Sequence, residues 1–239
     1  MNDKEYLKTG FDSMGVETDE KAIDRFLDFK EILLEWNEKI NLTTITEKEE
    51  IFIKHYFDSA ACLRDGYIKT GMKVIDVGTG AGFPGVPLKI LREDIDLTLL
   101  DSLNKRISYL DDVLSRLNIK NVELVHARAE EGGANVKYRE KFDIVLSRAV
   151  AAMNVLVEYC LPYVAVGGFF LCQKGPNCEE ELKDAEKAIA LLGGEIKEVK
   201  LYKLPYRDIT HSIIIIQKIK STPTKYPRKP GKPSSDPIK

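Results

Sequence analysis

The sequence lacks the features that mark membrane and secreted proteins. Nowhere in its 239 residues do apolar side chains run on for the roughly 18 positions that a membrane-spanning helix requires. The opening residues, Asn2 to Glu5, are polar where a secretory signal peptide would be apolar. We therefore expect a cytoplasmic protein that has no membrane partner.

Cysteine and histidine are scarce. The four cysteines stand at positions 62, 160, 172 and 178 without a CxxC pair, and there are three histidines. This spacing suits neither a zinc site nor a disulfide framework. We expect reduced, buried cysteines and no bound metal.

The overall composition excludes a disordered or fibrous chain. Apolar residues make up 44% and charged residues 31%, close to the average of globular proteins. The length allows one or two domains. Nothing repeats at a fixed period.

The net charge of −2 hides a basic C-terminal end. Residues 218–239 contain seven Lys and Arg, one acid and five of the ten prolines. Prolines at this density block helix formation, so we expect residues 221–239 to form an extended, poorly packed basic tail that is dispensable for the folded body. Such a tail suits a polyanion such as RNA, although a tail that only aids solubility has the same composition.

Apolar spacing divides the rest of the chain into two parts. Residues 18–40 and 48–63 show the three- and four-residue steps of amphipathic helices, which predicts a helical cap over residues 1–65. Short apolar runs then alternate with helical patterns through residues 66–220, as in parallel βαβ units. We expect strands near residues 74–77, 95–100, 122–126, 142–146, 168–173, 196–201 and 212–219. The last two are separated by a turn too short for a crossover helix and must pair antiparallel. The fold class is therefore α/β, with a doubly wound sheet.

A glycine-rich loop follows the first of these strands. Gly78, Gly80 and Gly82 are spaced GxGxG, and Asp76 stands two residues before the first glycine. Glycines at a strand end let the backbone turn tightly and approach a ligand in the crevice of an open sheet. An acid so close to the loop repels a pyrophosphate but attracts the amino group of a methionine moiety.

Asp101 ends the second strand, 23 residues after Gly78, where it can accept hydrogen bonds from both ribose hydroxyls. Acid, GxGxG and a second acid at the next strand are typical of S-adenosylmethionine-dependent methyltransferases. A nicotinamide or flavin enzyme, and a structural loop without a ligand, are the alternatives.

Longer motifs resemble one methyltransferase family. Phe83-Pro84-Gly85, Asp101-Ser102, Arg128-Ala129-Glu130 and Ser147-Arg148-Ala149-Val150 are similar to the RsmG family, also called glucose-inhibited division protein B. Trp36-Asn37, Asn41-Leu42-Thr43, His55, Asp58-Ser59 and the terminal Tyr226-Pro227-Arg228-Lys229-Pro230-Gly231 extend the resemblance from about residue 20 to about residue 231.

The resemblance implies a seven-stranded methyltransferase sheet with an N-terminal helical cap. It also implies S-adenosylmethionine as cofactor and methylation of guanine N7 in 16S ribosomal RNA or the small-subunit particle. Together with the loop and strand-end residues, it gives ten predicted cofactor-binding residues: Asp76, Gly78, Gly80, Gly82, Phe83, Asp101, Ser102, Ala129, Glu130 and Arg148.

The predicted chemistry is compatible with N7. This nitrogen carries an exposed lone pair and loses no proton, so the enzyme needs alignment and desolvation of the methyl donor, without a general base. The strand end at Ser147 lacks the Asn/Asp-Pro-Pro segment that grips exocyclic amines, and no cysteine is well presented as a nucleophile. Many small-molecule methyltransferases lack both signatures too.

The remaining candidates each have a structural alternative. Arg148 is the predicted catalytic residue, contacting guanine or phosphate, or it forms an ion pair with a nearby acid. The predicted RNA contacts are Lys174, Lys225, Arg228, Lys229 and Lys232. Lys174 is equally explained as a solvated lysine, and His55 as a core histidine with a local partner.

Two rival functions stay open. The chain could methylate a small molecule or a protein, against which the basic tail argues. It could also bind a nucleotide without chemistry, against which Asp76 and the intact glycines argue. We expect a monomer.

Overall fold

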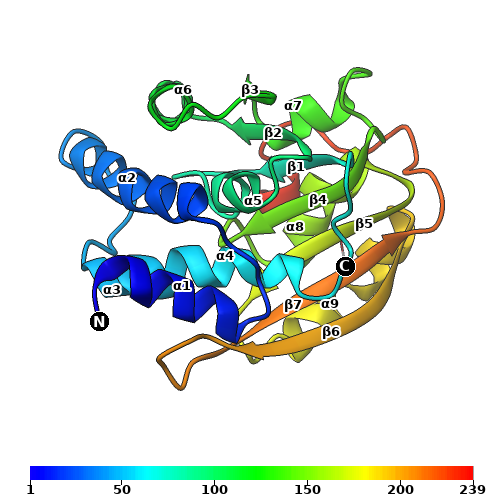
Figure 1. Ribbon diagram of the computed structural model, residues 1–239. Helices are drawn as coiled ribbons and strands as arrows, with labels where there is room; N and C mark the ends of the chain where they lie inside the picture. Colours follow the sequence, from blue (N-terminus) through cyan, green and yellow to red (C-terminus); the bar gives the residue numbers. More distant parts are fainter. Residues whose placement is uncertain (239) are drawn as a thin grey trace.

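The centre of the molecule is a seven-stranded sheet in the order β3-β2-β1-β4-β5-β7-β6 (Figure 1). The computed structural model describes residues 1–238. The strands are β1 (Lys73–Val77), β2 (Asp96–Asp101), β3 (Val122–His126), β4 (Phe142–Arg148), β5 (Val164–Lys174), β6 (Gly194–Lys203) and β7 (Thr210–Lys218). All seven coincide with predicted strands.

The direction of the strands confirms the predicted fold class. β1 to β5 pair in parallel, whereas β7 is antiparallel to both β5 and β6. Only residues 204–209 connect β6 to β7, and the backbone amide of Leu204 donates to Ile209 O within this turn. A connection of this length allows only an antiparallel pair.

Both faces of the sheet are buried at its central strands. In β7, Ile213 and Ile215 join the hydrophobic cluster on one face, while Ile214 and Ile216 join the cluster on the other. Alternate side chains of a strand point to opposite faces, so burial on both sides requires the continuous apolar runs seen in this sequence.

Helices cover the two faces (Figure 1). The cap helices, α5 and α6 pack on one face, and α8 and α9 pack on the other. The helical elements are α1 (Asp3–Ser13), α2 (Glu20–Asn37), α3 (Lys48–Ile51), the π-helical turn η1 (Phe52–Phe57), α4 (Asp58–Ala60), η2 (Ala61–Leu63), α5 (Gly85–Leu91), α6 (Asn104–Arg116), α7 (Ala129–Ala134), α8 (Met153–Cys160), η3 (Leu161–Tyr163), α9 (Glu179–Leu191) and α10 (Lys232–Ser235). No helix within residues 1–238 is long and apolar enough to cross a membrane.

Aromatic packing holds the N-terminal helices together. Phe11 lies 5.0 Å from Phe26 and 4.9 Å from Phe57 between ring centroids, and Phe29 lies 5.7 Å from Tyr56. These rings belong to the same hydrophobic cluster as the sheet residues on that face. The cap therefore shares its core with the sheet.

The first helix, α1, was not predicted, because only Leu7, Gly10 and Phe11 of its residues are buried and the period is too short to recognise. The predicted helices over 18–40 and 48–63 correspond to α2 and to the continuous series from α3 to η2.

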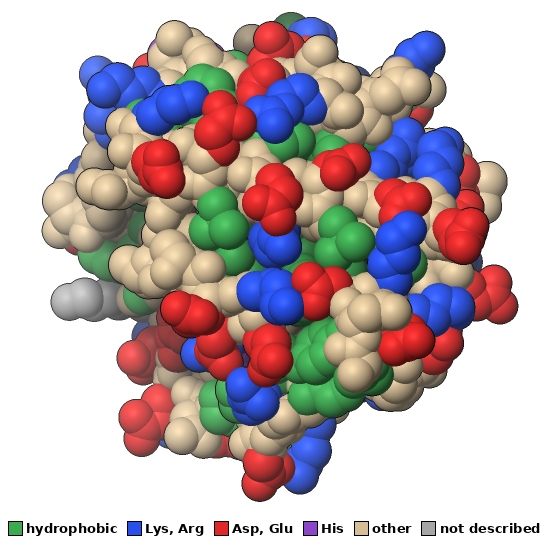
Figure 2. Space-filling view, turned by 60° about the vertical axis from the view of Figure 1, so that its left-hand side comes forward, with side chains coloured by type: hydrophobic (Ala, Val, Ile, Leu, Met, Phe, Trp, Pro, Cys, Tyr) green, Lys and Arg blue, Asp and Glu red, His purple; other side chains and the backbone are tan. Residues whose placement is uncertain are grey.

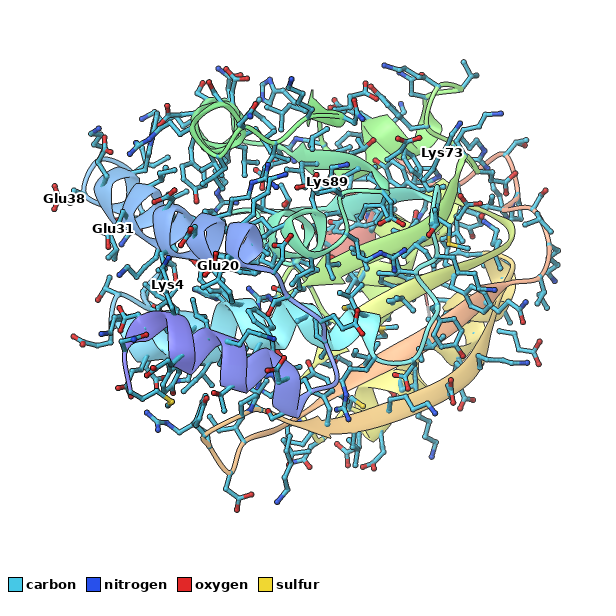
Figure 3. The ribbon with its side chains drawn as sticks, viewed as in Figure 1. Lys4, Glu20, Glu31, Glu38, Lys73 and Lys89 are labelled. Atoms are coloured by element: carbon cyan, nitrogen blue, oxygen red, sulfur yellow. The ribbon has the colours of Figure 1, made fainter. Side chains whose placement is uncertain are left out.

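Some charged side chains on the cap side of the sheet are exposed to solvent, whereas others are buried in the core. Glu31 and Glu38 lie on the outer side of α2 (Figure 3). Lys89 of α5 is instead 2% exposed, and its Nζ donates to the carbonyl oxygens of Glu93 (2.8 Å) and Ile95 (2.6 Å). These bonds satisfy a charged group that would otherwise be costly to bury.

The C-terminal end contradicts the expectation of an extended, poorly packed tail. Thr222, Tyr226 and Pro233 are buried, and residues 232–235 form the short helix α10. Lys218, which the charge count placed in the tail, is fully buried and donates to Leu161 O and to Thr222 Oγ1. Burial lowers the pKa of Lys218 to about 8, although the negative charge of Glu140 acts to raise it. Backbone carbonyls and buried acids, which proline content does not reveal, hold this end in place.

Candidate cofactor site

A cavity of about 460 Å³ opens at the carboxyl ends of β1, β2, β3 and β4. Its size falls within the range of small-molecule sites, and its position is the usual ligand crevice of an open α/β sheet. It is lined by residues from the cap, from the strand ends and from the C-terminal segment: Leu42, Thr43, His55, Val77, Gly78, Thr79, Gly80, Ala81, Phe83, Leu100, Asp101, Ser102, Arg106, Ala127, Arg128, Ala129, Glu130, Arg148, Ala149, Val150, Tyr159, Gly231 and Ser234.

The glycine loop between β1 and α5 forms the floor of this cavity. The backbone amides of Gly78 and Thr79 donate to Leu100 O at 2.9 and 3.0 Å, which ties the loop to β2. Gly80 has a positive φ of +60°, and a Cβ there would meet only Gly78 O, at 3.9 Å. Gly80 therefore leaves open space beside the backbone, as a close ligand requires.

Gly82 has a different role. Its φ is +91°, and a Cβ there would lie 2.8 Å from Val86 Cγ2 and 3.1 Å from Leu110 Cδ2. Gly82 does not line the cavity; the loop needs glycine there because α5 and α6 pack closely around it. The structure thus gives Gly82 a packing role, and its predicted contact with the cofactor stays a prediction.

Asp76 is also beneath the loop. It is fully buried, and its Oδ2 accepts hydrogen bonds from Thr79 Oγ1 (2.8 Å) and from the Gly85 amide (2.9 Å). Burial raises the pKa of Asp76 to about 6, although both hydrogen bonds oppose the rise. Asp76 is not among the residues that line the cavity, and its carboxylate shapes the loop. Its direct contact with an amino group stays a prediction.

Asp101 lies at the cavity where the sequence places it, at the end of β2. Its Oδ2 accepts from the Gly80 amide (2.9 Å) and from Arg106 Nη1 (3.2 Å), and its Oδ1 accepts from the Leu103 amide (2.9 Å). Each carboxylate oxygen has two acceptor positions, so capacity for a ligand hydroxyl remains. These bonds fix the carboxylate before a ligand binds.

Arg148, at the end of β4, is held by the cap. Its Nη1 donates to Asp58 Oδ2 (2.7 Å) and to Lys54 O (2.9 Å), and its guanidinium lies over the Phe83 ring at 5.3 Å. The ion-pair alternative for Arg148 is therefore realised, with an acid of the cap instead of an acid of the glycine loop. The guanidinium still lines the cavity.

Asp58 anchors this contact. It is 2% exposed and accepts further hydrogen bonds from Tyr202 Oη (2.7 Å) and His211 Nδ1 (2.6 Å). Burial works against ionisation, but the hydrogen bond from His211 and the charge of Arg148 outweigh it and lower the pKa of Asp58. In the sequence, only the family motif Asp58-Ser59 points to this residue.

His55 completes the wall. Its ring stacks on Phe83 with centroids 4.3 Å apart, Arg148 Nη2 lies 3.2 Å from its Nδ1, and Thr43 Oγ1 lies 3.0 Å from its Nε2. Because a guanidinium can only donate, Nδ1 accepts and Nε2 carries the proton. Burial and the charge of Arg148 lower the pKa of His55 to about 3, so the imidazole is neutral. Local partners satisfy this histidine, as its structural alternative expects.

The opposite end of the cavity is formed by α7, α8 and the C-terminal segment. Ala129 and Glu130 line it, and Glu130 Oε1 accepts a hydrogen bond from the Gly231 amide at 2.8 Å. Tyr159 and Ser234 also line this end and were missed, because neither stands in a strand-end motif. Of the ten predicted cofactor residues, eight line the cavity and two, Asp76 and Gly82, support the loop beneath it.

The predicted RNA contacts are distributed unevenly. Lys174 Nζ donates to Ala151 O and forms an ion pair with Glu181 at 2.7 Å. Arg228 is paired with the buried Glu158, which contradicts its expected place in a free tail. Lys225, Lys229 and Lys232 are exposed. Lys225 lies over the Tyr226 ring, and Lys232 pairs with Asp236.

Two further features are the candidate metal ligands and the cysteines. No group of three or more metal-ligating side chains is found in the part of the chain that the structure describes. All four cysteines are free and buried.

Solved structures with a similar fold define the class. A precorrin-6y C5,15-methyltransferase from Geobacter metallireducens matches with a TM-score of 0.51 at 17% identity, covering 75% of this chain and 91% of that one. A predicted O-methyltransferase from Agrobacterium tumefaciens matches with a TM-score of 0.53 at 16% identity, covering 69% and 80%. The chain thus has the Rossmann-like methyltransferase fold.

Sequence comparison identifies the family. The family model described as rRNA small subunit methyltransferase G matches residues 22–210. Curated proteins named ribosomal RNA small subunit methyltransferase G from Alkaliphilus oremlandii and Alkaliphilus metalliredigens are 57% and 54% identical, the first covering 99% of both chains and the second 100%. The chain belongs to the rRNA small subunit methyltransferase G family, which confirms the resemblance seen in the sequence.

Proposed function

We propose that this protein transfers a methyl group from S-adenosylmethionine to N7 of a guanine in 16S ribosomal RNA. The observation that carries the proposal is the cavity beside Gly80 and Asp101, in a chain that belongs to a family of small-subunit rRNA methyltransferases. The open side of Gly80 and the remaining acceptor capacity of Asp101 fit the cofactor.

Residues along the cavity would hold the cofactor in sections. Asp101 would accept a ribose hydroxyl at the acceptor position that remains on Oδ1. The loop at Gly78 and Gly80 would face the methionine portion, and Ala129 and Glu130 would border the purine. When bound, S-adenosylmethionine supplies an electrophilic methyl group on a sulfonium sulfur. The protein's task is then to align the acceptor with that methyl group and exclude water.

The groups around the cavity support a reaction that needs no base. His55 is neutral, but its Nδ1 already accepts from Arg148 and its Nε2 proton faces Thr43. Burial raises the pKa of Cys160 and, to about 12, that of Cys172, so neither offers a thiolate nucleophile. N7 attacks through a lone pair without losing a proton, and this environment is sufficient for it.

A second cavity supports a place for the target base. It has a volume of about 390 Å³ and shares His55, Arg148 and Ala149 with the cofactor cavity. Ala149 has a positive φ of +55°, which is unusual for a residue with a side chain and typical of functional sites. Gln173 also lines this second cavity, and its buried Oε1 has no hydrogen-bond partner. Guanine, with donors at N1 and N2, would suit such an acceptor.

Arg148 would act at the junction of the two cavities. Asp58 and Phe83 would fix the plane of its guanidinium. Arg148 would then position the base against the methyl donor, through N–H groups that are not already bonded to Asp58, Lys54 or His55. The exposed Lys225, Lys229 and Lys232 would contact RNA phosphates. On the face shown in Figure 2, basic and acidic side chains are interspersed, so an RNA contact on that face would involve only a few neighbouring side chains.

The protein would act in the cytoplasm, where its RNA substrate is, and as a monomer. Light scattering in solution tests the second point.

The direct test incubates the purified protein with S-adenosylmethionine and 16S rRNA, either free or in small-subunit particles, and analyses the nucleosides by mass spectrometry. We expect 7-methylguanosine in at least one of the two substrates. Turnover on a protein or a small molecule instead would contradict the RNA substrate. Binding of S-adenosylhomocysteine without any methyl transfer would favour a nucleotide-binding module.

A further inference from the structure

The C-terminal segment, residues 221–238, is anchored by a buried ion pair. Arg228 Nε and Nη2 donate to Glu158 Oε1 (2.9 Å) and Oε2 (2.6 Å), and the Arg228 backbone amide also donates to Oε1 (2.8 Å). Glu158, on α8, is fully buried. A buried carboxylate without its partner is strongly disfavoured, so this contact fixes the segment in place.

A second anchor holds the segment before Arg228. The guanidinium of Arg139 donates to three backbone carbonyls of the segment: Nη1 to Tyr226 O (2.7 Å), and Nη2 to Thr222 O (2.8 Å) and Pro223 O (3.3 Å). Tyr226 itself packs in the hydrophobic cluster behind the sheet. The segment (red in Figure 1) is thus fastened on the face opposite the cap.

From these anchors the chain runs to the cofactor cavity. The amide of Gly231 donates to Glu130 Oε1 at 2.8 Å, and Gly231 and Ser234 both line the cavity. Gly231 has a φ of +82°, a conformation that favours glycine. Ser234 is exposed, and its Oγ donates to Gly231 O at 3.0 Å.

We propose that the C-terminal segment is part of the cofactor site and binds the purine of S-adenosylmethionine through Gly231 and Ser234. This inference rests on the proposed function. If Asp101, at the end of β2, holds the ribose, the methionine lies toward β1 and β4, and the purine lies toward β3. The residues on the β3 side are Ala127 to Glu130, together with Tyr159, Gly231 and Ser234. The ion pair of Arg228 with Glu158 positions this wall.

Calorimetric titration with S-adenosylhomocysteine tests the contact at Ser234. Loss of one hydrogen bond changes affinity roughly 2- to 12-fold, and we expect Ser234→Ala to weaken binding within that range. Ser235→Ala is the matched control, because Ser235 is exposed and does not line the cavity. Arg228→Ala should weaken binding by roughly tenfold or more, whereas Ala at the exposed Lys220 should leave it unchanged.

Hydrogen exchange of the unmodified protein provides a test that no folding defect can obscure. Adding S-adenosylhomocysteine should slow exchange of the backbone amides in residues 229–235. Unchanged exchange there, together with wild-type affinity in Ser234→Ala and Arg228→Ala, would overturn the inference while leaving the proposed function intact. If the unmodified protein binds no S-adenosylhomocysteine at all, the proposed function itself fails.

Discussion

The two ends of the chain reach the same cavity from opposite faces of the sheet, and different forces hold them there. The cap packs through buried rings such as Phe26 and Phe29 and presents His55 beside Phe83. The C-terminal segment is fixed by directed polar contacts, among them the ion pair of Arg228 with the buried Glu158. Periodic apolar residues predict the first kind of packing, whereas a single buried carboxylate leaves no periodic signal.

The largest expected effects come from substitutions that remove one packing contact from the cap and one ion pair from the C-terminal segment. Phe29→Ala should cost about 3–5 kcal/mol of unfolding free energy, because it opens a cavity in the cap core. Arg228→Ala should cost a similar amount, about 3–5 kcal/mol, because it leaves the Glu158 carboxylate buried without its charged partner. Urea titration measures both.

A paired variant distinguishes the two mechanisms. Combining Arg228→Met with Glu158→Gln should recover most of the loss, since the glutamine oxygen can still accept from the amide of residue 228 and no charge stays buried. No such rescue exists for the cap. If the double variant is as unstable as Arg228→Ala, the buried charge is not what fixes the segment.

The next largest effect on stability is expected for Asp76, the carboxylate beneath the glycine loop. The pKa of Asp76 is about 6 in the folded protein and about 3.9 in an unfolded chain, so the folded state binds more protons between pH 4 and 6. Its contribution to stability is therefore lost as the pH rises through this window. Asp76→Asn should gain stability relative to the unmodified protein by about 1.4 kcal/mol per pH unit from pH 4 to 6, and then level off. Urea titrations across this window would refute the assignment if the difference stayed constant.

At the cavity itself, Asp101→Ala should weaken cofactor binding by about 10- to 150-fold, or roughly 1.5–3 kcal/mol, by removing charge-assisted hydrogen bonds to the ribose. Titration with S-adenosylhomocysteine measures the change. Unaltered affinity would mean that the ribose lies elsewhere.

The smallest effect concerns RNA. Replacing Lys225, Lys229 and Lys232 together by alanine should flatten the dependence of log affinity on log salt by about 2, at about 0.7 per single-strand phosphate contact. Point substitutions are the suitable test, because truncation after Lys220 would also remove the packed segment and its cavity residues. An unchanged slope would place the RNA surface elsewhere on the protein.

The sequence allowed the sheet to be predicted because its signals are local and repeated. The central strands carry runs of apolar residues, as in Ile213 to Ile216, the edge strand β6 alternates apolar with polar residues, and the glycine loop follows the first strand. The cavity wall from Gly78 to Glu130 could be predicted because motifs at successive strand ends meet at one edge of a parallel sheet.

The rest depended on contacts between distant residues. Asp58 lies 90 positions before Arg148, and Glu130 lies 101 positions before Gly231, so nothing in the spacing links them. The direction of a side chain also escaped prediction: Asp76 stands next to the loop in sequence but lies beneath it in the structure. Composition alone made residues 221–239 look like a free tail, because lysine and proline content does not indicate what a segment packs against.

The most direct measurement is a mass map of modified guanines in 16S rRNA from cells that lack this gene, complemented with either the unmodified protein or Asp101→Ala. The account predicts that one guanine loses its N7 methyl group without the gene, regains it with the unmodified protein, and regains much less with Asp101→Ala. Identical maps from cells with and without the gene would contradict it.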